Sequence, residues 1–377
     1  MRKKSLDTLS IGFIAAFCAL LLFYPLMSLL PGHNDNTENK TLFQFPEITK
    51  ENALQVPSYF DTYVDDHVPF KSAITRMRSR LIVQGLRTST GNTVILGKNG
   101  FLFYDSKYDG GSDTMTDYAA TNHYSEDQMA FYAGRLEALR QTCAERGVPF
   151  YLMICPNKES VYPENMPDYV NRYSGLTRAD VFVDYLRTHT AIEVIYPKDA
   201  LLAAKANNML YYRNDTHWNE VGGFIGARCL LNATLGIPMP EQPYIMATEE
   251  VVLKSPYVFG DLANTLSLRS VLPDLFYRPI EDLPGFSMDG IISDYFYDSH
   301  LVSTGKQGNA SIMMVRDSFF TAVHAYMAGY FSRGDFFWYT PDALPQALDQ
   351  MAELQPDIFV YEVVERNLDS VLNGMIF

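Results

Sequence analysis

Two segments that lie far apart in the sequence carry residue types suited to nucleophilic catalysis. The first is Asn214-Asp215-Thr216-His217-Trp218-Asn219. On an extended segment Asp215 and His217 would project on one face, with Cα atoms roughly 6.6 Å apart at ~3.3 Å rise per residue. The Asp215 carboxylate would then orient the imidazole through Nδ1 and leave Nε2 free as a base. Taken alone, an Asp and a His before a helix that Asn219 caps are more often turn residues.

The second segment, residues 311–320, is an apolar strand that runs into a turn holding Ser318 and then into a helix. In open α/β sheets, ligands bind at the carboxyl ends of the strands. The N-terminus of a helix also offers backbone N–H groups and a positive dipole end that can hold an oxyanion. An isolated strand followed by Asp317 and Ser318 is, however, more often only a helix cap.

Together the segments favour catalysis, because a hydroxyl nucleophile needs a base and the base needs an orienting group. We therefore predict that Ser318 is the nucleophile, His217 the base and Asp215 the group that orients the imidazole. The chain order Asp, His, Ser has precedent among unrelated triads. The backbone N–H of Ser318 would hold the oxyanion with a second donor that the sequence does not identify.

The elements that must position these residues alternate between strand and helix patterns from residue 91 onward, which indicates a parallel sheet with helices on both faces. Residues 93–96 and 101–104 flank Gly97-Lys98-Asn99-Gly100 and predict a β-hairpin. The stretch 237–308 is richer in Pro and Gly and predicts an irregular insertion with short strands. The remaining predicted strands are 148–154, 192–196, 311–315, 335–339 and 357–364, and the predicted helices are 125–145, 177–188, 198–206, 220–235, 319–331 and 342–353.

The N-terminal residues predict the compartment. Arg2, Lys3 and Lys4 precede an apolar run over 9–30, which is long enough for one membrane helix with its basic end in the cytoplasm. We expect residues 1–31 to be a cytoplasmic tip and a single-pass anchor in the cell membrane. A cleavable signal peptide is the competing interpretation. Residues 32–90 are then a polar spacer and a helical lead-in over 58–86, with Pro69 in a first turn, and residues 91–377 form an extracytoplasmic catalytic domain.

Composition and missing motifs exclude several functions. The formal charge of -14 and the absence of a basic run after residue 4 disfavour nucleic-acid binding. No Gly-x-Gly-x-x-Gly or Walker loop follows a strand, and neither His-Glu-x-x-His nor Cys-x-x-Cys occurs, so we expect no cofactor and no metal. The Asp65-Asp66-His67 cluster is more typical of a turn with a capping group than of a metal site. Four cysteines are too few for a disulfide framework and are expected to be free thiols.

Several motifs in their order along the chain are similar to those of a known family, the SGNH-type acetyltransferases of the alginate O-acetylation kind, often labelled DHHW proteins. The most specific is Asp215-x-His217-Trp218. The others are Asp65-Asp66-His67-x-Pro69-Phe70, Gly97-x-x-Gly100-Phe101-Leu102-Phe103, Pro156-x-Lys158 with Tyr162-Pro163-Glu164, Gly260-Asp261-Leu262, Asp317-Ser318-Phe319 and Glu362-x-x-Glu365-Arg366. The resemblance runs from about residue 55 to the C-terminus.

The resemblance implies an SGNH-hydrolase-like three-layer α/β sandwich around a five-stranded parallel sheet. It implies transfer of acetyl groups to hydroxyls of an exported polysaccharide, with acetyl supplied by a membrane-bound O-acyltransferase partner. One position departs from the family, because its usual Gly-Asp-Ser reads Arg316-Asp317-Ser318 here. Arg316 would place a charge near the oxyanion or an anionic sugar, or would mark altered activity. The alternatives are a polysaccharide deacetylase with the same triad and a non-catalytic glycan-assembly subunit.

Three further residues have open roles. Lys158, in the loop after the strand 148–154, is either a donor toward a substrate oxygen or a solvated loop lysine. Trp218 is a candidate contact for substrate, although packing that fixes His217 is favoured. Arg366 is expected to pair with Glu362 or Glu365 rather than with substrate.

Overall fold

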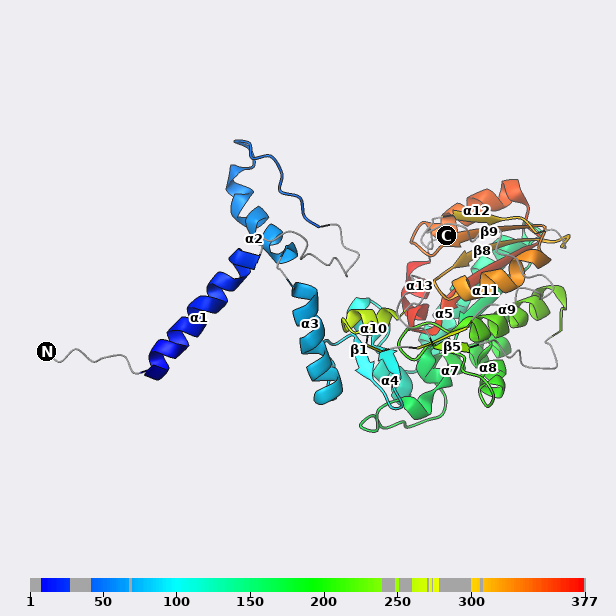
Figure 1. The fold of residues 1–377 in the computed structure, drawn as a ribbon. Helices are drawn as coiled ribbons and strands as arrows, with labels where there is room; N and C mark the ends of the chain where they lie inside the picture. Colours follow the sequence, from blue (N-terminus) through cyan, green and yellow to red (C-terminus); the bar gives the residue numbers. More distant parts are fainter. Residues whose placement is uncertain are drawn as a thin grey trace. The chain divides into compact units, whose positions relative to one another are not determined.

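The computed structural model describes residues 8–27, 42–67, 70–238, 248–250, 260–269, 271–272, 274–277, 300–305 and 308–375. The chain divides into two compact units, Met1–Thr88 and Ser89–Phe377. Figure 1 shows the elements of both units, coloured along the sequence. The second unit contains both segments that carry the candidate catalytic residues.

The first unit is helical. Most of the predicted membrane segment forms α1 (Thr8–Met27). In the described part of the chain, every helix falls short of the length and apolar character needed to cross a bilayer, so the predicted anchor is not confirmed. Residues 28–41, which include the end of the predicted membrane segment and the start of the predicted spacer, lie outside the described residues, as does Pro69.

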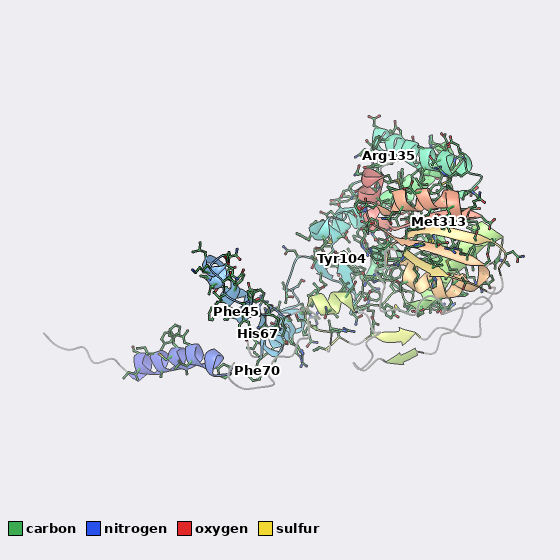
Figure 2. All side chains as sticks on the ribbon, turned by 90° about the horizontal axis from the view of Figure 1, so that it is seen from above. Phe45, His67, Phe70, Tyr104, Arg135 and Met313 are labelled. Carbon is green, nitrogen blue, oxygen red and sulfur yellow. The ribbon has the colours of Figure 1, made fainter. Side chains whose placement is uncertain are left out.

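The lead-in predicted over 58–86 is helical, as expected. It consists of α2 (Val56–Asp66) and α3 (Lys71–Arg80), and a π turn over Leu81–Gly85 continues α3. His67 ends α2, and its Nδ1 lies 2.8 Å from the carbonyl of Tyr63. The ring of Tyr63 packs against the rings of Phe45 and His67, and the latter two residues are labelled in Figure 2. His67 therefore has the capping role that was favoured over metal binding.

A six-stranded sheet forms the centre of the second unit, with the order β4-β3-β10-β8-β9-β7. The first five strands are parallel to one another, whereas β7 pairs antiparallel with β9. The sheet is thus mostly parallel, and the implied five-stranded sheet gains one edge strand from the stretch predicted to be an insertion. The strands are β3 (Phe150–Cys155), β4 (Glu193–Ile195), β7 (His300–Ser303), β8 (Ser311–Arg316), β9 (Arg333–Trp338) and β10 (Ile358–Val364).

Helices cover both faces of this sheet, which confirms the predicted layers. Along β8, Ile312 and Met314 belong to one hydrophobic cluster, whereas Met313 and Val315 belong to the other. This alternation is expected for a strand buried on both faces, and Met313 is labelled within the sheet in Figure 2. On the Met314 side lie α6 (Lys158–Val161), α8 (Lys198–Ala204), α9 (Glu220–Leu235) and α11 (Phe320–Met327). On the Met313 side lie α5 (Glu126–Ala144), α7 (Arg178–His189), α12 (Ala343–Leu354) and α13 (Leu368–Gly374).

Smaller elements lie outside the sheet. The predicted hairpin is present as β1 (Val94–Leu96) and β2 (Leu102–Tyr104), joined through Asn99 and Gly100, which both have positive φ. Short helices α4 (Thr114–Ala119) and α10 (Asp261–Thr265) are described, as is a pair of short strands, β5 (Thr248–Glu250) and β6 (Leu275–Tyr277). The strands β5, β6 and β7 all fall in the predicted insertion, of which residues 239–247, 251–259 and 278–299 lie outside the described residues.

Local sequence signals account for the ends of the main helices. Ser125 and Gln128 form a reciprocal capping box at the start of α5, and Gly147, just past its end, adopts a φ of +74° that suits glycine. All four cysteines are free, as predicted. Burial raises the pKa of the Cys143 thiol to about 12, so this cysteine is an inert packing residue.

Candidate active site

Asp215 and His217 lie in a bent loop. Tyr211 and Trp218 form an isolated antiparallel bridge, and the residues between them leave this bridge and return to it. The predicted extended geometry is therefore wrong. The two side chains still meet, because Asp215 Oδ1 accepts hydrogen bonds from both the backbone N–H of His217 at 2.9 Å and its Nδ1 at 2.7 Å. Asp side chains commonly close such a local turn with the residue two positions on.

Asn219 ends this loop and caps the next helix, as predicted. Its Oδ1 accepts hydrogen bonds from the N–H groups of Val221 and Gly222 at 3.0 and 3.1 Å, at the start of α9. A Cβ atom on Gly223 would lie 2.4 Å from the Cβ of Ala322 in α11, so glycine permits the close approach of α9 and α11, which run side by side in Figure 1. This packing brings the loop with His217 next to the helix that follows Ser318.

Ser318 lies in the turn between β8 and α11. Its neighbour Asp317 holds the turn: one carboxylate oxygen accepts from the N–H of Phe319 at 2.8 Å and the other from the N–H of Val364 at 2.7 Å. The N–H of Asp317 in turn donates to Glu362 Oε2 at 2.7 Å. Asp317 thus stabilises the local turn and ties it to the end of β10, while the hydroxyl of Ser318 is left for another partner.

That partner is His217. The Nε2 atom of His217 lies 2.7 Å from Ser318 Oγ, and its Nδ1 atom lies 2.7 Å from Asp215 Oδ1. The Asp215 side chain is fully buried, whereas the His217 side chain is 28% exposed and Ser318 is half-buried. The structure therefore brings together the three residues predicted from the two segments, with the serine and the imidazole reachable from solvent.

The protonation of this chain of residues follows from its electrostatics. Burial alone would raise the pKa of Asp215, but the adjacent His217 and the hydrogen bonds to the carboxylate outweigh burial and lower that pKa. Burial would conversely lower the pKa of His217, but the Asp215 charge outweighs it and raises the pKa above the ordinary value. Asp215 is thus an ionised partner that favours a proton on the imidazole.

These properties are those of a nucleophile, a base and an orienting carboxylate. With its Nδ1–H donated to Asp215, His217 has Nε2 available to accept the hydroxyl proton of Ser318. The adjacent α11 begins at Phe320, so the N–H groups of a helix start lie next to the nucleophile. The arrangement can form an acyl-serine from a carbonyl substrate.

Asp261 is a further acidic residue of the site, which the sequence indicated only as part of a family motif. Its backbone N–H donates to Asp215 Oδ2 at 3.0 Å, and its carboxylate accepts from the N–H and the hydroxyl of Thr216 at 2.8 and 2.5 Å. Asp261 Oδ2 also lies 3.8 Å from His217 Nδ1. Asp261 therefore supports the loop and adds negative potential beside the imidazole.

Asp215, His217 and Asp261 also offer ligand atoms that lie within 4.8 Å of one another. Carboxylate and imidazole groups are common metal ligands, but both oxygens of Asp215 already accept N–H donors. Both ring nitrogens of His217 are likewise engaged, by Asp215 and by Ser318. We therefore assign these side chains to the hydrogen-bonded chain and not to a metal centre.

The position of Lys158 fits neither of its two predicted roles. It is the first residue of α6 and is only 3% exposed, so it is not a solvated loop lysine. Its ammonium group donates to the carbonyls of Tyr212, Arg213 and Asp215 at 3.1, 3.2 and 2.6 Å. Lys158 thus positions the loop that carries Asp215, with its donors engaged by protein oxygens rather than by a substrate.

Trp218 packs in the core instead of contacting substrate. It is 1% exposed, and its Nε1–H donates to the carbonyl of Phe319 at 2.9 Å. The residue after the base is thereby bonded to the residue after the nucleophile. The burial of Trp218 argues against a contact with substrate and fits the packing role that the sequence favoured.

Arg316, which stands where the family has glycine, is the last residue of β8 and is 3% exposed. Its guanidinium lies 4.6 Å from the ring centroid of Trp338, its neighbour on β9. The positive-φ residues among the described ones do not include Arg316, so this position does not require glycine for its backbone conformation. Burial against Trp338 explains how arginine is accommodated.

The contacts of Arg366 differ from the predicted ion pair with Glu362 or Glu365. Among the described contacts, ion pairs join it to neither Glu362 nor Glu365. Glu362 instead accepts from Cys155 and the N–H of Asp317, and Glu365 accepts from Asn157, Ser160 and Thr177. The guanidinium lies over the rings of Phe319 and Tyr104, so Arg366 belongs to the surroundings of the site.

Comparison with known families agrees with this arrangement. Residues 94–281 match the model of the SGNH hydrolase-like domain of the acetyltransferase AlgX. The match covers the hairpin, β3, β4 and the Asp215–His217 loop. The mostly parallel α/β fold described above is thus an SGNH-like fold.

Individual proteins are also similar to the chain. It is 26% identical over 362 residues to a probable alginate O-acetylase AlgJ of Pseudomonas syringae pv. tomato, an alignment that covers 93% of this chain and 84% of the relative. It is 26% identical over 324 residues to the protein of that name in Pseudomonas aeruginosa, with coverage of 80% and 75%. Among solved structures, the O-acetyltransferase domain of Pseudomonas putida AlgJ aligns with 73% of this chain and 91% of its own length, at 21% identity and a TM-score of 0.47.

Proposed function

The chain belongs to the family of SGNH hydrolase-like acetyltransferase domains represented by AlgX, and from this premise we propose that it moves acetyl groups, through Ser318, to hydroxyls of an exported polysaccharide. The observation that carries the proposal is the continuous hydrogen-bonded chain from Asp215 through His217 to Ser318, with 2.7 Å at each link. Its nucleophilic end is half-buried and open to a substrate.

In the first half-reaction, Ser318 Oγ attacks the carbonyl carbon of an acetyl ester or thioester donor. His217 Nε2 takes the hydroxyl proton, and Asp215 stabilises the imidazolium that forms. The carbonyl oxygen becomes an oxyanion, for which we propose the backbone N–H of Ser318 as one donor. When this tetrahedral intermediate collapses, the bond to the leaving group breaks, and the leaving group takes the proton from His217. Acetyl-Ser318 and the free alcohol or thiol are the products.

In the second half-reaction, a sugar hydroxyl replaces the serine as nucleophile. His217 removes the proton of this hydroxyl as its oxygen attacks the acetyl carbonyl carbon of acetyl-Ser318. Collapse of the second intermediate returns the proton to Ser318 Oγ and leaves the acetyl group on the sugar. Water in place of the sugar would release acetate, so the competition between sugar and water separates a transferase from the alternative esterase.

The wider setting is part of the same proposal. We propose that residues 1–31 anchor the protein in the cell membrane with the catalytic unit on the extracytoplasmic side, and that a membrane-bound O-acyltransferase supplies the acetyl group. The basic residues Arg2, Lys3 and Lys4 ahead of the apolar run support the orientation. The alginate O-acetylase names of the similar proteins support a polysaccharide acceptor.

The test is a comparison of Ser318→Ala with the wild-type protein. Each is incubated with an activated acetyl ester, with and without oligosaccharide, and acetylated sugar and free acetate are quantified. We expect Ser318→Ala to lose both products, because the acyl-serine cannot form. Exposed Ser370 provides the matched control, and Ser370→Ala should retain wild-type rates.

The outcomes separate the candidate functions. Acetylated sugar from the wild-type protein supports the transferase, whereas free acetate alone supports the esterase. A serine-directed fluorophosphonate probe that labels the wild-type protein but not Ser318→Ala argues against a non-catalytic assembly subunit. Acetyl transfer by Ser318→Ala at the wild-type rate would falsify the assignment of the nucleophile.

A further inference from the structure

Arg366 is a cation that lies over the ring of Phe319, the residue after the candidate nucleophile, and its backbone is held by two hydrogen bonds. It lies in the 3₁₀ turn Glu365–Asn367 that directly follows β10. Its N–H donates to Asn157 Oδ1 at 3.3 Å, and its carbonyl accepts from the N–H of Ser112 at 3.1 Å. Asn157 follows β3, so the position of Arg366 is set by the same edge of the sheet that positions the site.

The guanidinium of Arg366 faces the site. Its central carbon lies 5.2 Å from the ring centroid of Phe319, the residue after the nucleophile, and 5.5 Å from that of Tyr104 on the hairpin. The ring of His217 lies 5.2 Å from the same Phe319 ring. The cation and the base therefore flank one side chain that is adjacent in sequence to Ser318.

This guanidinium has none of the partners typical of a structural arginine. Buried or half-buried arginines are normally paired with a carboxylate. Glu362 and Glu365, the nearest acids in sequence, are occupied by other donors, and the ion pairs and hydrogen bonds found among the described residues do not involve the Arg366 side chain. Its N–H donors are therefore available to a ligand.

The charge of Arg366 also acts on the base. Three charged groups face His217: Asp215 from its own loop, Asp261 from α10, and Arg366 from the turn after β10. Burial lowers the pKa of His217, whereas the charges of Asp215 and Asp261 raise it. Arg366 has a smaller effect and lowers this pKa. A cation in this position disfavours the imidazolium, so it is best explained by a negative charge that develops elsewhere in the site during the reaction.

We propose that the guanidinium of Arg366 is the second donor of the oxyanion site, and that it binds the carbonyl oxygen of the acetyl group as this oxygen gains negative charge. As Ser318 Oγ bonds to the carbonyl carbon, the electron pair of the carbonyl π bond moves to the oxygen, and Arg366 donates a charge-assisted hydrogen bond to it. When the carbonyl reforms, the leaving-group bond breaks and Arg366 releases its ligand unchanged. The inference rests on the proposed function of Ser318.

A different ligand for the same guanidinium would be the carboxylate of an acidic sugar acceptor. The two ligands are distinguishable, because the oxyanion forms even when no sugar is present. A neutral acetyl ester without a carboxylate, used in the absence of an acceptor, therefore isolates the contact with the acetyl oxygen.

The experiment measures the rate at which the full-length protein forms acetyl-Ser318 from such an ester, for Arg366→Gln, Arg366→Lys and the wild type. We expect Arg366→Gln to lower this rate by about 100- to 1,000-fold, as removal of one oxyanion donor typically does. Arg366→Lys should recover part of the rate, because it keeps a cationic donor. Arg333→Gln is the matched control, since Arg333 pairs with Asp335 at the opposite end of its strand from the site.

A second readout separates this role from a structural one. Loss of the cation should move the acid limb of the acylation rate of Arg366→Gln to higher pH, because His217 then protonates more readily. Thermal unfolding of each variant checks that the fold is intact. The inference is overturned if Arg366→Gln acylates at the wild-type rate, or if its defect appears only with acceptors that carry a carboxylate. Loss of activity in Ser318→Ala is independent of either outcome, so the proposed function and the role of Arg366 can fail separately.

Discussion

The two segments that supply the site residues are positioned by different means. The turn with Ser318 continues directly from β8, whose place is set by parallel pairing with β10 on one side and β9 on the other. The loop with Asp215 and His217 has no regular structure beyond the Tyr211–Trp218 bridge. It is held instead by side chains from other parts of the chain: Lys158 on its carbonyls, and Asp261 and Asp274 on its N–H groups.

This difference shows where single substitutions should matter most. A turn that follows a buried central strand keeps its position through many backbone hydrogen bonds, and removal of one side-chain contact leaves the strand in place. An irregular loop has no such ladder, so its buried polar groups depend on a few individual side chains. We therefore expect the base side of the site to be more sensitive to its supporting residues than the nucleophile side.

Among the residues that support the two segments, the largest effect is expected for Lys158→Met, which removes the donor shared by three loop carbonyls. Because these buried carbonyls lose their partner, the loop should shift and move Asp215 relative to His217. We expect kcat/KM for acetyl transfer to fall about 100-fold, the cost typical of a displacement near 1 Å. Lys98→Met is the control, since Lys98 is exposed and pairs with Asp168, and it should retain wild-type activity.

The lowered pKa of Lys158 predicts that the activity of the wild-type protein declines at alkaline pH. Burial lowers the pKa of Lys158 to about 8, so its ammonium charge is lost above that pH and acetyl transfer should decline. Stability should not decline for this reason. In the unfolded chain Lys158 has the ordinary lysine pKa of ~10.4. Between the folded and the unfolded pKa, the unfolded chain therefore binds more protons than the folded chain, so Lys158 makes the free energy of unfolding rise with pH there. Activity and chemical denaturation measured from pH 7 to 10 check this separation.

A smaller effect is expected for Asp317→Asn on the nucleophile side. The amide is neutral and keeps one acceptor oxygen, so either the N–H of Phe319 or that of Val364 loses its acceptor. The strand β8 keeps its pairing, and we expect kcat to fall about tenfold, with about 1–3 kcal/mol lost from the free energy of unfolding. A loss of activity equal to that of Lys158→Met would contradict the contrast between loop and turn.

Trp218→Phe tests a second hydrogen bond between the two segments, in addition to that between His217 and Ser318. Phenylalanine preserves most of the packing but leaves the carbonyl of Phe319 without the Nε1–H donor. We expect the free energy of unfolding to fall by about 1–3 kcal/mol and kcat to change only a few-fold. Denaturant titrations alongside steady-state kinetics would show whether the link serves stability or catalysis.

The smallest effect is expected for Asp261→Asn, because the substitution removes the charge and keeps the support of the loop. The amide oxygen can still accept from the N–H of Thr216, and the backbone N–H of residue 261 still donates to Asp215. The proposed mechanism needs neutral His217, and the raised pKa of this residue should place the acid limb of kcat/KM above the ordinary histidine value of about 6.5. Asp261 contributes to that raised pKa, after the larger effects of burial and of Asp215. Removal of its charge should therefore move the acid limb to lower pH and leave the rate at pH 8 nearly unchanged. A limb that stays in place would show that the Asp261 charge does not reach the imidazole.

Much of the fold was predictable because its signals are local. The hairpin turn, the capping box of α5, the Asn219 cap and the apolar strands all lie within short stretches of sequence, and the structure has each of them within a few residues of its predicted bounds. Short strands were predicted in the stretch 237–308, but not that one of them, β7, would join the central sheet, because its place there depends on pairing with β9, which is distant along the chain.

The residue types and their order by themselves determined which hydroxyl, imidazole and carboxylate could form a catalytic set, and on which kind of fold. Only the tertiary structure decided how this set is supported. The burial of Lys158 under the loop, the approach of Asp261 to the imidazole and the exposure of the Arg366 guanidinium to the site depend on contacts between segments far apart in sequence. A lysine or arginine has the same appearance in a sequence whether water, a carboxylate or a backbone carbonyl receives its hydrogen bonds, and the packing of the folded chain makes that choice.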